Sequence, residues 1–448
     1  MRTSDKRSPV TFRRTAAYRK AVDLVRKLKD AGHEALLVGG CVRDLLMGRS
    51  PKDFDIATSA VPEQVAALFP RIIPVGVQFG VQIVVSGGYS FEVATFRTDL
   101  SYKDGRHPEG VRFSTPEEDA LRRDFTVNGI FFDPVGQKVI DYVGGRADLK
   151  KKLIRAIGNP AKRFQEDRLR MLRAVRFASV LDFRIDPATF RAICRLARGI
   201  GEVSRERVRD ELVKLFTGPH PGRGLSLLDE SGLLAVILPE VAKMKGVQQP
   251  PEFHPEGDVF VHTRILLDRL KKPSTVLAFA GLLHDVGKPP TFRVADRIRF
   301  DGHDRVGASM AKRICRELRF SNAETEAISE IIGDHMKFKD VRRMRLSTLK
   351  RFMALGTFEE QLAMHRADCL ASHGDLSNWR FLRKKQKELS SEELKPEPLI
   401  KGGDLLEMGF PEGPAIGKIL KAVEEKQLEG DLKSKESALS WVQKEFRR

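Results

Sequence analysis

The sequence of 448 residues is poor in cysteine and lacks long apolar runs. Its four cysteines, Cys41, Cys194, Cys315 and Cys369, are far apart and form no C-x-x-C pair. This spacing indicates free thiols in a reducing compartment and predicts no structural zinc. No apolar run approaches the length of a membrane-spanning helix, and the basic residues before Arg14 lack the apolar core of a signal peptide. We therefore expect a soluble, cytoplasmic protein without a membrane partner.

Acidic residues are outnumbered by basic ones. The chain has 79 Lys and Arg against 61 Asp and Glu, a net charge of +18. Such a surface attracts polyanions, and RNA is the partner that we expect. The length predicts two to four domains, and there are no internal repeats or low-complexity blocks. The oligomeric state stays open.

The pattern of apolar residues divides the chain into a mixed α/β part and a helical part. Four short strands are predicted near the N-terminus, with a turn over residues 86–89 joining the last two as a hairpin. From Leu153 onward apolar residues recur mainly at helical spacing. We predict an α+β head at residues 15–150, a helical neck and body at 151–251, a further helical domain at 252–382, and a linker with a helical tail at 383–448. The predicted strands are 35–38, 54–57, 81–85 and 91–96.

A glycine turn followed by two carboxylates is the strongest local signal. Gly39, Gly40 and Arg43 follow a short apolar run, and Asp53 and Asp55 come soon after. Glycines let the backbone approach a triphosphate before a helix begins, and an arginine there neutralises phosphate charge. Side chains alternate along a strand, so we expect both aspartates to face one Mg²⁺. The arrangement indicates metal-assisted nucleotidyl transfer, with a second Mg²⁺ completing a two-metal site.

Glu92 alternates with apolar neighbours in the last predicted strand of the head. It is either a third metal carboxylate or a solvated strand residue, and the sequence leaves both readings open. Further on, Arg123, Asp124 and Asn128 form a short span that suits ribose and triphosphate, or an ordinary charged turn. Between these features, the polar segment 97–108 predicts a mobile loop near the active site, or a plain surface loop. Its functional candidates are Tyr102, Asp104, Arg106 and His107.

Asp167 and Arg170 are three residues apart in a predicted helix. We expect them on one helical face, where an acceptor and a donor lie side by side. A carboxylate accepts from the amino group of cytosine or adenine, and a guanidinium donates to the neighbouring ring nitrogen. Uracil and guanine present a carbonyl instead and would leave buried polar groups unpaired. The pair therefore predicts selection of C and A, against the alternative of a surface ion pair.

Taken in order, these motifs resemble the class II nucleotidyltransferases, which include tRNA CCA-adding enzymes and bacterial poly(A) polymerases. The resemblance implies a polymerase-β-like head with a mixed sheet, Asp53 and Asp55 as metal ligands, and Asp167 with Arg170 as the base-selecting pair. It places Gly39, Gly40 and Arg43 at the triphosphate and Arg123, Asp124 and Asn128 near the ribose. Residues 141–145 resemble the hinge between head and neck, and residues 205–212 resemble the neck helix.

A second constellation resembles an HD-type phosphohydrolase domain. Imidazoles and carboxylates in this pattern suit a transition metal such as Mn²⁺, Ni²⁺ or Fe²⁺, and adjacent His284 and Asp285 at a helix end can both reach one ion. Two further histidines offer ligands for a second metal. Such a domain either hydrolyses phosphate esters or persists as an RNA-binding scaffold. The candidate ligands are His262, His284, Asp285, His303, His335 and Asp368.

The predicted activity is template-independent addition of C and A from CTP and ATP to the 3′ end of tRNA, with release of pyrophosphate. The loop at 102–108 and the segments 400–405 and 413–420 resemble CCA-adding members, although the tail segments are also explained by packing on the HD domain. Residues 128–133 differ from the shorter stretch usual in those members and favour poly(A) or A-adding relatives. The alternatives are therefore A-only or poly(A) addition, an HD-domain metal phosphohydrolase acting on RNA or nucleotide ends, and a noncatalytic RNA-binding protein.

Overall fold

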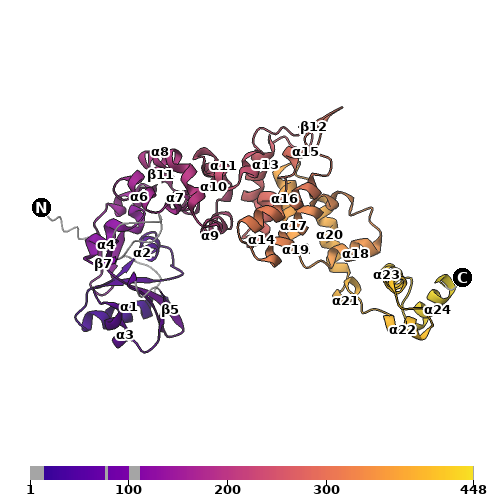
Figure 1. Ribbon diagram of the computed structural model, residues 1–448, viewed down its shortest axis with the longest axis horizontal. Coiled ribbons are helices and arrows are strands. Elements are labelled where there is room, and N and C mark those ends of the chain that lie inside the picture. The colour runs from indigo at the N-terminus through magenta and orange to yellow at the C-terminus, as the bar shows by residue number, and fades with distance from the viewer. Residues whose placement is uncertain (1–14, 76–78, 100–110, 447–448) are drawn as a thin grey trace. The chain divides into compact units, whose positions relative to one another are not determined.

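The computed structural model describes residues 15–75, 79–99 and 111–446. The chain divides into two compact units, Met1–Ile237 and Leu238–Arg448, which we call unit 1 and unit 2 and describe separately (Figure 1). Most of the loop predicted at 97–108, including Tyr102, Asp104, Arg106 and His107, lies outside the described residues. Within the described part of the chain, no helix is long and apolar enough to cross a membrane. The four cysteines are free, as predicted.

Unit 1 begins with a seven-stranded sheet of order β3-β4-β5-β2-β1-β8-β9. The β2 and β5 strands pair in parallel and the other neighbours pair antiparallel, which confirms the mixed sheet of an α+β head. The four predicted strands are present, but β3, β8 and β9 had not been predicted. The strands are β1 (Ala35–Val38), β2 (Asp55–Thr58), β3 (Ile72–Pro74), β4 (Val81–Ser86), β5 (Tyr89–Thr95), β8 (Ile130–Asp133) and β9 (Lys138–Asp141).

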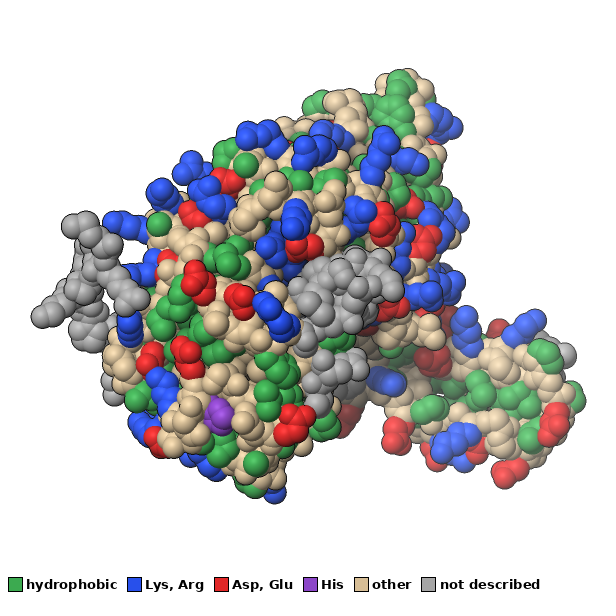
Figure 2. Space-filling model, turned by 60° about the vertical axis from the view of Figure 1, so that its left-hand side comes forward, with side chains coloured by type: hydrophobic (Ala, Val, Ile, Leu, Met, Phe, Trp, Pro, Cys, Tyr) green, Lys and Arg blue, Asp and Glu red, His purple; other side chains and the backbone are tan. Residues whose placement is uncertain are grey.

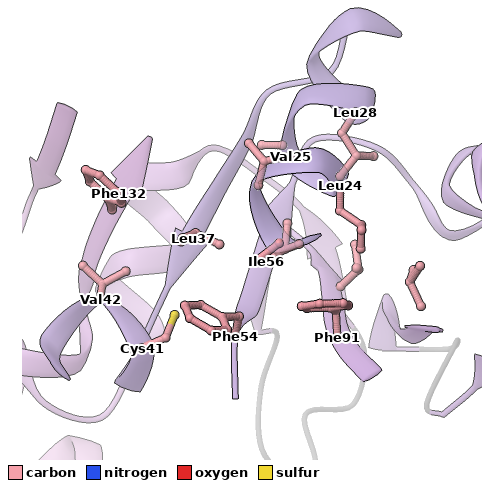
Figure 3. Close-up of a cluster of buried hydrophobic side chains, with 14 of the residues drawn as sticks. Leu24, Val25, Leu28, Leu37, Cys41, Val42, Phe54, Ile56, Phe91 and Phe132 are labelled. Carbon is pink, nitrogen blue, oxygen red and sulfur yellow. The ribbon is translucent and has the colours of Figure 1, made fainter. Parts of the chain in front are cut away.

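Alternating side chains give this sheet an apolar core on each face. On one face, Leu24 and Leu28 of α1 (Ala16–Asp30) pack with Leu37 and Ile56 of the central strands (Figure 3). The next residues along β1 and β2 face the opposite way and join the second core, which includes Val38, Ala57, Phe96 and Phe131. Strand alternation thus produces two buried faces. Asp55, two residues before Ala57, is placed on the side of the second core.

The β4–β5 hairpin closes where the sequence predicts it. Ser86 pairs with Tyr89, and Gly87 and Gly88 between them have φ of +59° and +81°. Both central residues of this tight turn need the left-handed region, which glycine adopts without strain. The turn fixes the register of β5 against β4. On its other side β5 pairs in parallel with β2, where Glu92 lies opposite Asp55.

The rest of unit 1 is mainly helical, with an antiparallel pair, β6 (Arg97–Asp99) and β7 (Val111–Phe113), and a short parallel pair, β10 (Leu153–Ile154) and β11 (Arg184–Ile185). The pattern predicted neither pair, and β6 occupies the start of the segment predicted as a loop at 97–108. Its α7 packs against α9 and α10 and carries a nearly continuous buried face. Helix α5 (Gly145–Lys150) precedes the neck, and its first residue packs closely against the head. A Cβ at Gly145 would lie 2.1 Å from the carbonyl oxygen of Thr126, so only glycine fits there. The helices are α6 (Pro160–Glu166), α7 (Leu169–Leu181), α8 (Pro187–Leu196), α9 (Arg205–Phe216), α10 (Pro221–Glu230) and α11 (Leu233–Ile237).

Unit 2 is built on five helices around a buried polar cluster, with a small hairpin between β12 (Arg293–Val294) and β13 (Ile298–Arg299). These helices are α13 (Val259–Arg269), α14 (Thr275–Leu283), α16 (His303–Glu317), α17 (Asn322–Asp334) and α19 (Phe358–Ala371). They are followed by α20 (Ser377–Glu388), which extends into the stretch predicted as a linker or helix end.

The C-terminal tail of unit 2 has a core of its own. It contains α22 (Gly402–Glu407), α23 (Pro414–Glu429) and α24 (Lys435–Phe446), and α23 starts at a proline as predicted. The tail also contacts α18 (Leu346–Met353), where Lys350 Nζ donates to the carbonyl of Leu428 at 2.9 Å. It is therefore both a separate cluster and a segment that packs on the rest of unit 2.

Candidate active site and metal centre

The predicted glycine turn lies beside the carboxylates of the head. Gly39, between β1 and α2 (Gly40–Leu46), has φ of +73°, a conformation that favours glycine. A Cβ at this position would lie 3.3 Å from Arg123 Nη1 and 3.7 Å from Asp55 Oδ2. The turn therefore brings the backbone next to one cation and one carboxylate that are distant in sequence.

Asp53, Asp55 and Glu92 lie near one another, but not entirely as predicted. Strand β2 starts at Asp55, and Asp53 lies in the bend before it, so strand alternation does not place both aspartates. Burial and the neighbouring Glu92 raise the pKa of Asp55 to about 6, with a further rise from Asp53 and an opposing effect of Arg123. Carboxylates that repel one another in this way fit a hard cation, which would relieve the repulsion.

Arg43 has a different environment from the one predicted. Its side chain is buried, and its Nη1 donates to Asn128 Oδ1 at 2.7 Å. Asn128 in turn donates to Asp124 at 3.1 Å, and Arg173 Nη2 donates to the same carboxylate at 2.6 Å. Burial opposes ionisation of Asp124, but Arg173 outweighs it and lowers the pKa to about 2. Arg43, Asn128 and Asp124 thus form a buried network, in which Arg173 was missed because no short motif marks it.

Arg123 is the more accessible cation at the turn. It pairs with Asp119 at 2.9 Å, and its guanidinium lies over the ring of Phe131 at 5.3 Å. Asp119 is buried in α4 (Pro116–Arg122) and also pairs with Arg122 at 2.6 Å. The sequence analysis missed Asp119, although its spacing of three and four residues from the two arginines was a usable signal.

The predicted helical face with Asp167 and Arg170 does not exist. Helix α6 ends at Glu166, Asp167 is extended, and its Oδ1 accepts from the backbone N–H of Leu169 at the start of α7. A short carboxylate that bonds the nearby backbone competes with helix continuation, which explains the break. Asp167 Oδ2 instead accepts from Arg207 of α9 at 2.8 Å, and Arg170 donates to Glu166 at 2.8 Å.

Basic side chains are widespread on the surface of unit 1. Figure 2 shows many Lys and Arg side chains, with acidic ones between them, on the visible face. Several exposed arginines come from the helical part between β11 and α9, where they offer sites for phosphates. They are Arg184, Arg191, Arg195, Arg198 and Arg205.

In unit 2, the structure brings all six predicted HD residues together. Among the described residues, three groups of candidate ligand atoms lie within 4.8 Å of one another, all in this region of the chain. The six predicted residues form two of them, His262 with His284 and Asp368, and Asp285 with His303 and His335. The third group is His254, Glu256 and His262.

The imidazoles of this cluster share one orientation. His284, His303 and His335 each place Nδ1 within 2.6–2.9 Å of the carbonyl three residues earlier. His262 instead places Nδ1 2.6 Å from Glu256 Oε1. With Nδ1–H donating, Nε2 is left as a lone-pair donor, and Nε2 is the usual ligand atom in such an arrangement.

The Nε2 atoms point at one another or at carboxylates. Those of His303 and His335 are 3.2 Å apart. Those of His262 and His284 lie 3.0 Å from Asp368 Oδ1 and 3.1 Å from Asp285 Oδ2, without a hydrogen bond of good geometry. Burial and the charge of neighbouring His284 lower the pKa of His335 to about 4, which favours the neutral form that binds metals. These donor atoms therefore fit divalent cations.

Asp285 lies between the two groups. Its Oδ2 is 2.8 Å from Lys288 Nζ and 3.1 Å from His284 Nε2, while its Oδ1 is 3.8 Å from His303 Nε2. Burial opposes ionisation, but His284 and Lys288 outweigh it and hold the pKa of Asp285 well below its usual range. Lys288 also donates to Gln249 at 2.6 Å. Gln249 was not found from sequence, since it lies outside any motif.

A cavity of about 650 Å³ opens over this cluster. Its walls include Phe253, His254, Lys288, Arg299 and His365 as well as the candidate metal ligands other than His262. The volume suits a ligand of nucleotide size, and the cations suit phosphate. Glu256 and His254, which were not predicted, lie beside His262.

Comparisons with known proteins agree with this arrangement. Residues 35–155 match the family model of the "Poly A polymerase head domain", residues 182–245 match "Probable RNA and SrmB- binding site of polymerase A", and residues 258–371 match the "HD domain". The second match covers the region of exposed arginines, and the third covers the six candidate metal ligands.

Similar whole proteins are also known. The chain is 48% identical over 221 residues to a CCA-adding enzyme of Geobacillus stearothermophilus and 46% identical over 215 residues to one of Bacillus licheniformis. These matches cover 49% and 48% of this chain and 54% of each relative, so the chain spans about half the length of the curated relatives it matches.

A solved structure matches over a greater length. The crystal structure of the Bacillus stearothermophilus CCA-adding enzyme in complex with CTP has a TM-score of 0.77 and 30% identity, and the match covers 97% of this chain and 98% of that one. The Thermotoga maritima CCA-adding enzyme complexed with tRNA_CCA has a TM-score of 0.60 at 21% identity and shares the fold, with 96% of this chain and 95% of that chain covered.

Proposed function

Because this chain belongs to the family of CCA-adding enzymes, we propose that it adds C and A nucleotides from CTP and ATP to the 3′ end of tRNA and releases pyrophosphate. Family membership also confirms the resemblance of the sequence motifs to class II nucleotidyltransferases. The observation that carries the proposal is the meeting of Gly39, Arg123 and the carboxylate of Asp55 at one end of the head sheet.

Each residue of the head has a role in this proposal. Asp53 and Asp55, with Glu92 beside them, hold Mg²⁺ through carboxylate oxygens. When bound, Mg²⁺ supplies Lewis-acid activation of the RNA 3′-hydroxyl and stabilises charge on the departing pyrophosphate. Gly39 and Gly40 let the triphosphate approach the backbone, and Arg123 neutralises its charge.

The buried network of the head positions these groups. We assign Asp124 and Asn128 to the ribose side of the site, where they also hold Arg43 in place. Arg43 then acts on the triphosphate from behind the turn. This arrangement favours catalysis by positioning and electrostatics, because donors that are fixed in advance need no reorganisation.

Asp167 and Arg170 remain the proposed readers of the base. Their partners Arg207 and Glu166 fix each side chain separately, so the pair needs no shared helical face. A carboxylate and a guanidinium held in this way accept C and A and reject U and G by the unpaired groups that the wrong base leaves. We place the head at 15–150, the neck and body at 151–251, the HD domain at 252–382 and the tail at 383–448, with a cytoplasmic location.

The test is incorporation into tRNA transcripts that lack the last three nucleotides. We expect incorporation of CTP before ATP in Mg²⁺, none with EDTA, and none with Asp53→Ala. An Asp23→Asn variant, which changes an exposed residue of α1, serves as the matched control. Incorporation of ATP alone would replace this proposal by A-only or poly(A) addition, which the stretch at 128–133 favours.

A second candidate function is metal-dependent phosphohydrolysis in the HD domain. The two ligand groups and the cavity above them support it. We propose Mn²⁺, Ni²⁺ or Fe²⁺ there, because imidazole ligands suit these ions. Hydrolysis of bis-p-nitrophenyl phosphate with Mn²⁺ should vanish in Asp285→Ala and persist in Asp53→Ala. If both variants still hydrolysed the substrate, the activity would be assigned to a contaminant.

A further inference from the structure

The two ligand groups of the HD cluster are not equivalent. The first group has the carboxylate of Asp368, a share of Asp285 through Oδ2, and Glu256 behind His262. The second group has two imidazoles and only the other oxygen of Asp285. Lys288 offsets the share of Asp285, since its Nζ lies 2.8 Å from Oδ2, but Asp368 and Glu256 still give the first position more negative charge. The first position therefore attracts a divalent ion more strongly.

Glu256 adds a second difference. It is the only carboxylate among the described residues that accepts from the Nδ1 of a candidate ligand, whereas the other three imidazoles donate to backbone carbonyls. A carboxylate behind a metal-bound imidazole fixes its tautomer and makes its Nε2 a better donor. This effect reaches His262 alone.

Glu256 is itself held in place for this purpose. Its Oε1 lies 2.9 Å from His254 Nδ1 as well as 2.6 Å from His262 Nδ1, and its side chain is only 7% exposed. His262 is fully buried, so its ring has no freedom to turn away. The carboxylate and the ligand ring are therefore fixed relative to each other before any ion binds.

We propose that the HD cluster binds two divalent cations with unequal affinity, and that Glu256 is the positioning residue that makes the His262–His284–Asp368 position the tighter one. This proposal rests on the proposed binding of metal ions by the HD cluster and not on nucleotide transfer by the head. Either proposal can therefore fail without the other.

The experiment is a calorimetric titration of the metal-free full-length chain with Mn²⁺. An Asp53→Asn/Asp55→Asn background removes the proposed head site, so the remaining ions report on the HD cluster. We expect one tight and one weak ion. Glu256→Gln should weaken the tight ion by about 10- to 100-fold and leave the weak ion unchanged.

Two further variants separate the positions. His303→Ala should remove the weak ion and keep the tight one, and His262→Ala should remove the tight one. Asp301→Asn, a carboxylate that lines the same cavity outside the cluster, serves as the control and should change neither. If near-UV circular dichroism shows that Glu256→Gln does not fold, Glu256→Asp replaces it, and its shortened carboxylate should give a smaller loss at the tight position only.

Several results would overturn the proposal. They are two ions of equal affinity, a single ion, or a Glu256 variant that weakens both ions alike or neither. Binding of three ions would show that His254 and Glu256 are ligands of their own site instead of supports for His262.

Discussion

The head and the HD domain each gather carboxylates, yet their electrostatics are opposite. In the head, Asp55 is next to Glu92 and Asp53, and its pKa rises to about 6. In the HD domain, Asp285 is next to His284 and Lys288, and its pKa falls well below the usual range. The carboxylates of the head thus outweigh the opposing charge of Arg123 until a metal cation binds, whereas Asp285 of the HD cluster is already balanced by its own neighbours.

This difference fits two kinds of metal chemistry. A site of carboxylates without imidazoles favours Mg²⁺, which keeps water and phosphate among its ligands. A cluster of imidazoles held at Nδ1 favours transition metals bound mostly by protein. The two sites can therefore be addressed separately by the choice of metal and by mutation.

The largest effect is expected from removing the head carboxylates. Asp53→Ala with Asp55→Ala should lower nucleotide incorporation by about 10³-fold or more, because the site loses its cation and the charge stabilisation it provides. The HD ions should remain, as measured by metal analysis after dialysis. The converse variant, His284→Ala, should lose metal and retain incorporation. Loss of both properties in either variant would show that the sites are coupled.

The next effect concerns the stability of the HD cluster. Asp285→Asn should destabilise the metal-free protein by about 3–5 kcal/mol, since it leaves the buried Lys288 without its charge partner. Urea unfolding in EDTA measures this change. Asp296→Asn, which breaks an exposed pair with Arg299, should leave the urea midpoint unchanged, because solvent screens that pair. Equal effects of the two variants would contradict the conclusion that Asp285 compensates the buried charge of Lys288.

An Asp-to-Asn substitution at Asp55 in the head should change the free energy of unfolding in the opposite direction. The pKa of Asp55 is raised from 3.8 to about 6 on folding, so the folded state binds the proton more tightly than the unfolded state. The resulting loss of folding free energy is absent below pH 3.8, grows as the pH rises to about 6, and reaches its full value above that pH. Asp55→Asn should therefore stabilise the metal-free protein on the order of 1–3 kcal/mol at pH 7.5 and hardly at pH 4, as measured by urea unfolding. Destabilisation at pH 7.5 would refute the repulsion.

The smallest effect is expected at Asp167 and Arg170, the proposed readers of the base. Arg170→Ala should reduce discrimination between CTP and UTP by about tenfold or somewhat more, because no guanidinium donor then opposes the ring N–H of uracil. Competition between labelled nucleotides measures this ratio. Lys162→Ala, an exposed change on α6, should leave the ratio unchanged. A slower reaction with unaltered selectivity would assign Arg170 a structural role through its pair with Glu166.

Local features were predictable from the sequence. The apolar run of β1, the Gly87–Gly88 turn and the spacing of the HD histidines all depend on a few neighbouring residues, and each is present in the structure. The meeting of the six HD residues was found because a recognisable motif marks it.

Features that depend on distant partners were not predictable. Nothing in the sequence joins Arg173 to Asp124 or Glu256 to His262, because these contacts form only when separate elements pack. The prediction that Asp167 and Arg170 share a helical face was wrong, because the hydrogen bond from the backbone N–H of Leu169 to Asp167 outweighed the helical pattern. Charge pairs of this kind are set by the fold and not by spacing.

The central claim is tested most directly by tRNA transcripts that end before the CCA, after its first C and after its second C. Each is given single labelled nucleotides in Mg²⁺, and the products are resolved at one-nucleotide resolution. The account predicts C addition to the first two transcripts, A addition to the third, and no extension beyond the completed end. Addition of A alone, or an A tail without a stop, would contradict it.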